Sequence, residues 1–209
     1  MAARAQAIWE RAVDLGVNAP PFERNPSSWR QRIPIAVLAG VGFLISTYLA
    51  FYQWGLIDTV WDPVFGDGSK KVLESNAAQK MDRVLRMPDA AFGAWGYLSE
   101  VVFTLVGSTR RWQFRPWMVM LFGLDVIPLG IVSFALVVTQ GFVIGSWCFL
   151  CLVTAVISLV LVFLAYDEVW ASLKYLRRVW RHTKDRKLLW NVFLGRPDAR
   201  ADALATRRD

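Results

Sequence analysis

The only two cysteines of the chain, Cys148 and Cys151, are separated by two residues in the segment W-C-F-L-C. A Cys-x-x-Cys pair can form a redox-active disulfide, and it can also supply half of a zinc site. A closed structural zinc site needs four ligands, and the single histidine, His182, lies in the C-terminal basic segment. We therefore expect no metal site. Two interpretations stay open: a redox pair, or two small apolar residues packed in a helix.

The position of the pair favours redox chemistry. The cysteines lie within the first turn or two of an apolar segment that runs from about Trp147 to Tyr166. Unpaired backbone N–H groups in a first helical turn favour a thiolate, and a spacing of three places both sulfurs on one helix face. We expect Cys148, nearest the helix terminus, to be the exposed attacking thiol, with Cys151 one turn deeper.

The elements that must hold this pair are long apolar segments. Of the 209 residues, 55% are hydrophobic and only 20% are charged, which is unusual for a soluble domain. A helix needs about 20 apolar residues to cross a bilayer. Segments close to that length occupy residues 34–54, 90–107, 117–144 and 147–166. The sequence predicts an all-α membrane protein built as a four-transmembrane-helix bundle.

The arginines and lysines predict the orientation of this bundle, because they collect in cytoplasmic segments. Basic residues dominate the chain before residue 34, the connection 108–116 and the tail after residue 166, whereas the connection 55–88 has equal numbers of acids and bases. We expect both termini in the cytoplasm and the Cys-x-x-Cys pair at the opposite, outer face. The net charge of +7 accompanies no base-reading motif, so we expect no nucleic-acid partner.

The pattern divides the chain into three regions: a cytoplasmic N-terminal segment over residues 1–33, a membrane domain over 34–166, and a basic cytoplasmic tail over 167–209. Residues 2–15 and the tail from Val169 to Trp180 both show apolar positions at helical spacing, typical of amphipathic helices in the membrane interface. The expected partner of the tail is the lipid bilayer, with a partner protein as the alternative. A short helix near residues 70–75 is expected to cap the mouth of the bundle.

Three motifs in this order resemble the vitamin K epoxide reductase family: D-P-V-F-G-D-G-S-K-K-V-L-E-S at 62–75, A-F-G-A-W-G-Y at 91–97 and W-C-F-L-C-L-V-T at 147–154. The likeness covers roughly Pro34 to Glu168. It implies a bacterial inner-membrane protein with a quinone pocket, in which Cys151 passes electrons to the quinone and Cys148 exchanges with cysteines of the first loop. The residues that the resemblance places near the quinone are Asp89, Phe92, Tyr97, Trp147 and Thr154.

Two positions depart from the family pattern. Ser69 stands where a loop cysteine is expected, and Ala155 stands where animal members carry an aromatic hydroxyl, for which Thr154 is a partial substitute. Three functions therefore stay open. The first is a quinone-coupled thiol oxidoreductase whose Cys148 reacts directly with a thioredoxin-fold partner. The second is a catalytically degenerate relative that serves as a structural or quinone-holding subunit of a larger membrane complex, and the third is transport or another membrane function.

Two acids lie inside the predicted crossings. Glu100 in the second and Asp125 in the third fall at similar depth on neighbouring antiparallel helices, and no crossing contains Lys or Arg. Such acids usually face the interior of a bundle, water or a partner. We consider a hydrogen bond between helices, proton delivery during quinone reduction, and pairing of Asp125 with a basic residue of another subunit.

Overall fold

The computed structural model describes residues 25–196, 198 and 200–201, and the regular secondary structure of these residues is entirely helical. The helix expected over residues 2–15 lies outside the described residues. The elements in chain order are α2 (Trp29–Gln53), α3 (Gly68–Leu73), α4 (Asn76–Leu85), α5 (Asp89–Leu105), α6 (Arg111–Phe114), α7 (Pro116–Thr139), the π-helical turn η1 (Gln140–Ile144), α8 (Phe149–Thr183) and α9 (Arg186–Phe193). The prediction of an all-helical protein is confirmed for this part of the chain.

The chain forms two compact units. The first, which we call the cysteine unit, contains residues 34–104 and 124–165. The second, which we call the terminal unit, contains residues 25–33, residues 105–123 and the described residues from 166 onward. Helices α2, α5, α7 and α8 each contribute residues to both units.

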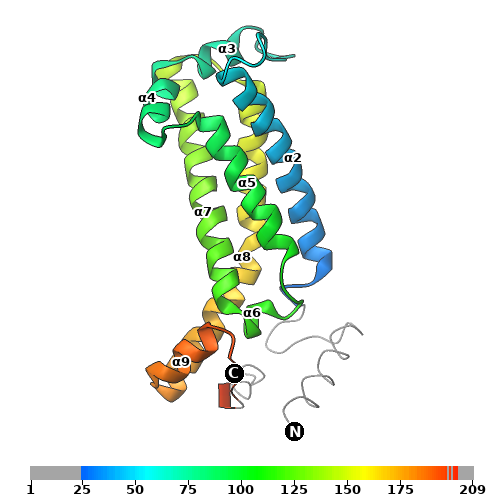
Figure 1. Ribbon diagram of the computed structural model, residues 1–209, viewed down its shortest axis with the longest axis vertical. Coiled ribbons are helices and arrows are strands. Elements are labelled where there is room, and N and C mark those ends of the chain that lie inside the picture. The colour runs from blue at the N-terminus through cyan, green and yellow to red at the C-terminus, as the bar shows by residue number, and fades with distance from the viewer. Residues whose placement is uncertain (1–24, 197, 199, 202–209) are drawn as a thin grey trace. The chain divides into compact units, whose positions relative to one another are not determined.

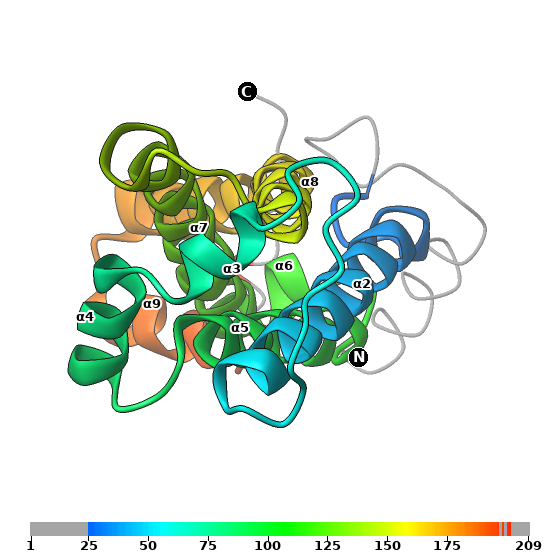
Figure 2. The same ribbon diagram turned by 90° about the horizontal axis from the view of Figure 1, so that it is seen from above.

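In the cysteine unit, the long segments of α2, α5, α7 and α8 lie side by side (Figures 1 and 2). Polar contacts join them: Ser99 of α5 donates to Asp125 of α7, and Tyr97 of α5 contacts Ser158 of α8. The short helix α3 crosses the end of these segments that also carries η1, which it contacts (Figure 1). The pair Cys148–Cys151 lies at the same end, where α8 begins.

Three helices of the described chain are long and apolar enough to cross a membrane: α2, α7 together with η1, and α8. These helices make the chain consistent with an integral membrane protein. Helix α5 has 17 residues, which gives a length of about 25 Å at 1.5 Å per residue. Helix α8 has 35 residues, so the apolar positions expected as a tail helix from Val169 to Trp180 continue the same helix beyond the predicted end at Tyr166.

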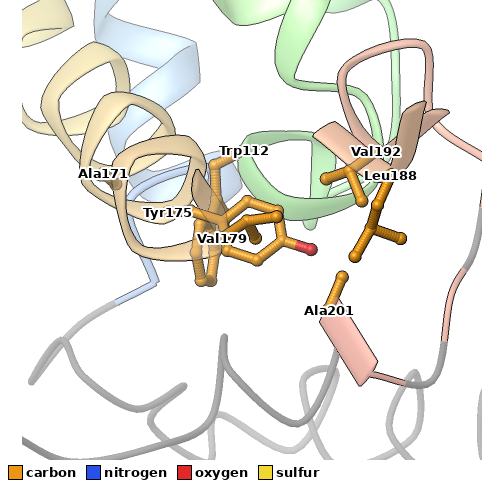
Figure 3. Packing of buried hydrophobic residues seen from close by; sticks show 7 residues of the cluster. All are labelled: Trp112, Ala171, Tyr175, Val179, Leu188, Val192 and Ala201. Atoms are coloured by element: carbon orange, nitrogen blue, oxygen red, sulfur yellow. The ribbon is translucent and has the colours of Figure 1, made fainter. Parts of the chain in front are cut away.

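The terminal unit has its own hydrophobic core (Figure 3). Its buried members come from α6, from the last turns of α8, from α9 and from the short stretch that follows it: Trp112, Ala171, Tyr175, Val179, Leu188, Val192 and Ala201. The rings of Trp112 and Tyr175 meet edge to face with centroids 6.1 Å apart, an arrangement that aromatic pairs prefer. Asp185 caps α9 by accepting the N–H groups of Lys187 and Leu188.

Candidate active site

The two cysteines are joined by a disulfide bond at the start of α8, with their Cα atoms 5.2 Å apart. Cys148 precedes the first helical residue, Phe149, and its sulfur accepts the backbone N–H of Cys151 at 3.2 Å. A side chain before the first helical residue that accepts a first-turn N–H acts as a helix cap. The cap therefore directs one of the unpaired N–H groups of α8 at the sulfur of Cys148.

The prediction that Cys148 is the exposed thiol is wrong. Cys148 is 0% exposed, whereas Cys151 is half-buried and lines a cavity. The reason is tertiary: the N–H of Cys148 donates to Oε1 of Gln140 in η1 at 3.0 Å, and α3 packs directly on the preceding residue. A Cβ atom on Gly68 would lie 2.3 Å from the carbonyl oxygen of Trp147, so only glycine permits this approach.

Asp62 fastens the loop before α3 to the start of α8. One carboxylate oxygen accepts Ser69 Oγ at 2.6 Å and the N–H of Phe149 at 3.4 Å, and the other accepts the N–H groups of Val64 and Phe65. Partial burial would raise the pKa of Asp62, but these hydrogen bonds together hold it below its ordinary value. Ser69, at the position where a cysteine was expected, thus contributes a hydrogen bond to the attachment of the loop.

The cavity beside Cys151 has a volume of about 100 Å³ and lies within the cysteine unit. Four of the five residues expected near a quinone line it: Asp89, Phe92, Tyr97 and Thr154. Trp147 is not part of its wall. Its ring packs on Gly141, where a Cβ atom would lie 2.8 Å from the indole.

Tyr97 is held firmly at the cavity wall. A Cβ atom on Gly42 of α2 would lie 2.7 Å from the Tyr97 ring, so the missing side chain of this glycine makes room for the phenol. The hydroxyl of Tyr97 donates to the carbonyl oxygen of Thr154 at 2.7 Å and lies 2.6 Å from Ser158 Oγ. Asp89, at the start of α5, accepts Nε2 of Gln53 at 2.5 Å.

Glu100 and Asp125 do not line this cavity. Asp125 accepts a hydrogen bond from Ser99 and so connects α7 to α5. Glu100 is 1% exposed, and neither of its carboxyl oxygens has a hydrogen-bond partner among the described residues. Burial of a carboxyl group without a hydrogen-bond partner is energetically costly.

Sequence reasoning did not single out Asp62, Ser133, Gln140 or Ser158, and it did not foresee the hydrogen bond made by Ser69. Ser133 and Gln140 line the cavity, and Ser158 contacts Ser133 at 3.0 Å from behind the wall. Single serines inside apolar helices carry no spacing signal. The motif D-P-V-F-G-D-G-S did contain Asp62 and Ser69, and the turn-forming sequence after the aspartate was a usable indication of a capped loop.

The close packing of α3 predicts a change in thiol access. In a Cys151→Ser background, Gly68→Ala should make the remaining Cys148 thiol react several-fold faster with a small alkylating reagent, because the added methyl group forces α3 away from Trp147. The measurement is the alkylation rate of the purified protein by mass spectrometry. Gly40→Ala is the matched control, since a Cβ there meets nothing within 4 Å. Equal rates in the two variants would contradict the covering role of α3.

The model of the vitamin K epoxide reductase family matches residues 33–166 of the sequence. This range contains both cysteines and every residue named above that lines the cavity. Among curated proteins, none matches the sequence closely enough to count as a relative.

Proposed function

Because the chain belongs to the vitamin K epoxide reductase family, we propose that it is a quinone-coupled thiol–disulfide oxidoreductase of the membrane. The observation that carries this proposal is the Cys148–Cys151 disulfide with Cys151 on the cavity wall. The wall is mostly apolar and has a few polar side chains, among them Ser133 and Thr154. Such a wall suits a quinone ring, which is flat and apolar except for its two oxygens.

The proposed reaction has two halves that balance. A dithiol of a thioredoxin-fold partner reduces the Cys148–Cys151 disulfide, so that the partner gains a disulfide and this chain gains two thiols. The two thiols then form their disulfide again and give up two electrons and two protons, which convert a quinone to its hydroquinone. Cys151 is the residue that transfers electrons in the cavity.

Access of the partner is the step in which this chain differs from the family pattern. Ser69 cannot relay electrons by disulfide exchange, and Cys148 is buried under α3. We propose that the partner thiol reaches Cys148 after α3 and its loop move away from Trp147. The bonds from Asp62 to Ser69 and Phe149 are the contacts that such a movement must break.

The alternative is a catalytically degenerate relative that holds a quinone or serves as a structural subunit of a larger complex. The observations that favour it are the covered Cys148 and the absence from the sequence of any cysteine besides the pair. The two functions differ in whether the disulfide ever changes its redox state.

The test is therefore to follow that redox state in membranes that contain the full chain. The pair is reduced with a dithiol, the excess is removed, and a short-tailed quinone is added before acid quenching and alkylation. We expect the disulfide to reform in step with the appearance of hydroquinone, one per pair. A pair that stays reduced in the presence of quinone would overturn the oxidoreductase proposal and favour the structural alternative.

We also propose that α5 is the fourth membrane crossing, with both termini in the cytoplasm, the cysteine pair at the outer face of a bacterial inner membrane, and the basic tail against anionic headgroups. In a cysteine-free background, Asp67→Cys should react with a membrane-impermeant thiol reagent in intact cells, whereas Lys187→Cys should react only after lysis. Both positions are exposed. The reverse pattern of labelling would contradict the orientation.

A further inference from the structure

Three hydroxyl groups from three helices form one hydrogen-bonded chain at the wall of the cavity. Ser133 Oγ of α7 lies 3.0 Å from Ser158 Oγ of α8, and Ser158 Oγ lies 2.6 Å from the hydroxyl of Tyr97 of α5. The Tyr97 hydroxyl lies 2.7 Å from the carbonyl oxygen of Thr154. Ser133 and Tyr97 line the cavity, and Ser158 is buried behind them at 1% exposure.

The carbonyl group at the end fixes the direction of this chain. A carbonyl oxygen cannot donate, and each hydroxyl has a single hydrogen, so the hydrogen between Tyr97 and Thr154 belongs to Tyr97. The hydrogen between Tyr97 and Ser158 must then come from Ser158. By the same count, the hydrogen between Ser158 and Ser133 comes from Ser133.

Ser133 therefore offers the cavity only lone pairs. The other hydroxyls that α7 and α8 present to the cavity are committed in the same way: Thr154 donates to the carbonyl oxygen of Cys151, and Thr139 donates to that of Ala135. The side chains that can still donate are on other elements and include Ser46 of α2 and the amide of Gln140 in η1. The hydroxyl groups of the α7 and α8 wall thus accept hydrogen bonds from the cavity and do not donate to it.

We propose that Ser133 determines specificity by accepting a hydrogen bond from a hydroxyl group of a hydroquinone, so that the cavity binds the reduced ring more tightly than the quinone. A quinone has only acceptor oxygens, which would face the lone pairs of Ser133 without a hydrogen between them. A hydroquinone supplies that hydrogen. This inference rests on the proposed function, because it assumes that the cavity holds the ring.

The test measures binding of a short-tailed naphthoquinone and of its hydroquinone under argon to the full chain in lipid nanodiscs. Both forms are measured in a Cys148→Ala, Cys151→Ala background, in which neither can react with the pair and no new hydroxyl group enters the cavity. The quantity of interest is the Kd of the quinone divided by the Kd of the hydroquinone. We expect a ratio above one, and Ser133→Ala should lower it roughly twofold to tenfold through weaker hydroquinone binding, as for the loss of one neutral hydrogen bond.

Ser158→Ala should also change the ratio of the two Kd values, but for a different reason. Ser158→Ala removes the acceptor of the Ser133 hydrogen, so Ser133 becomes able to donate to a quinone carbonyl, and the ratio should fall through tighter quinone binding. Ser46→Ala is the matched control, because this serine lines the cavity outside the hydroxyl chain and its loss should not lower the ratio. Binding of both forms with a ratio that Ser133→Ala leaves unchanged would overturn this inference and leave the proposed function standing. Binding of neither form in the background protein would overturn both.

Discussion

Cys151→Ser is expected to reduce the rate of hydroquinone formation to that of membranes without the protein, while the chain still inserts and purifies normally. Cys151 is the cysteine that lines the cavity, and a serine hydroxyl can neither form the disulfide nor give up electrons through it. The measurement is dithiol-dependent quinone reduction in proteoliposomes. Size-exclusion chromatography of the variant in mild detergent shows whether folding and any assembly are intact.

Cys148→Ser provides the matched comparison, because it also removes the disulfide but leaves the thiol in the cavity. Both single variants should lose turnover. Only Cys148→Ser should be modified by an apolar thiol-reactive quinone analogue, since in Cys151→Ser the remaining thiol is buried under α3. Retained turnover in Cys151→Ser would exclude the proposed role of this residue, and modification of both variants at equal rates would show that Cys148 is more accessible than the structure indicates.

Short contiguous motifs made most of the site predictable. The segments at 91–97 and 147–154 contain Phe92, Tyr97, Cys151 and Thr154, all of which line the cavity. The helices were also predictable, because runs of about 20 apolar residues leave few other structures in a bilayer. The ends of the helices were harder to predict. Helix α8 continues to Thr183, because the end of an apolar run does not by itself end the backbone hydrogen bonding of a helix.

What the sequence did not reveal depends on contacts between segments far apart in the chain. The burial of Cys148 depends on α3, which is 75 residues or more upstream, and on a backbone approach that only Gly68 permits. The hydroxyl chain needs Tyr97, Ser133 and Ser158 from three helices, and no periodicity marks isolated serines. Glu168 lies just past an apolar segment, where a charged residue normally contacts water, so nothing in the sequence indicated that it is buried.

Glu168→Ala is expected to destabilise the terminal unit by about 3–5 kcal/mol, the usual cost of removing one partner from a buried ion pair. Glu168 is 1% exposed and accepts Nε and Nη2 of Arg111, each at 2.6 Å, together with Ser27 Oγ at 2.5 Å. Without the carboxylate, the buried Arg111 guanidinium keeps its bond to the carbonyl oxygen of Val106 but loses the only anion in this set of contacts. The measurement is unfolding of the purified protein in mild detergent.

The matched variant separates the charge imbalance from the loss of packing. In the double variant Arg111→Met, Glu168→Leu, both partners of the ion pair are replaced by apolar side chains of similar size, and such replacements of a buried ion pair are often neutral or stabilising. The buried Arg32 then loses the repulsion of Arg111 together with the attraction of Glu168. We therefore expect the double variant to unfold close to the wild type and well above Glu168→Ala. If the double variant is as unstable as the single one, hydrogen bonds of this pair to its neighbours, such as those to Ser27 and Val106, matter more than the balance of charge. If Glu168→Ala unfolds like the wild type, the carboxylate is not a structural anchor of the terminal unit.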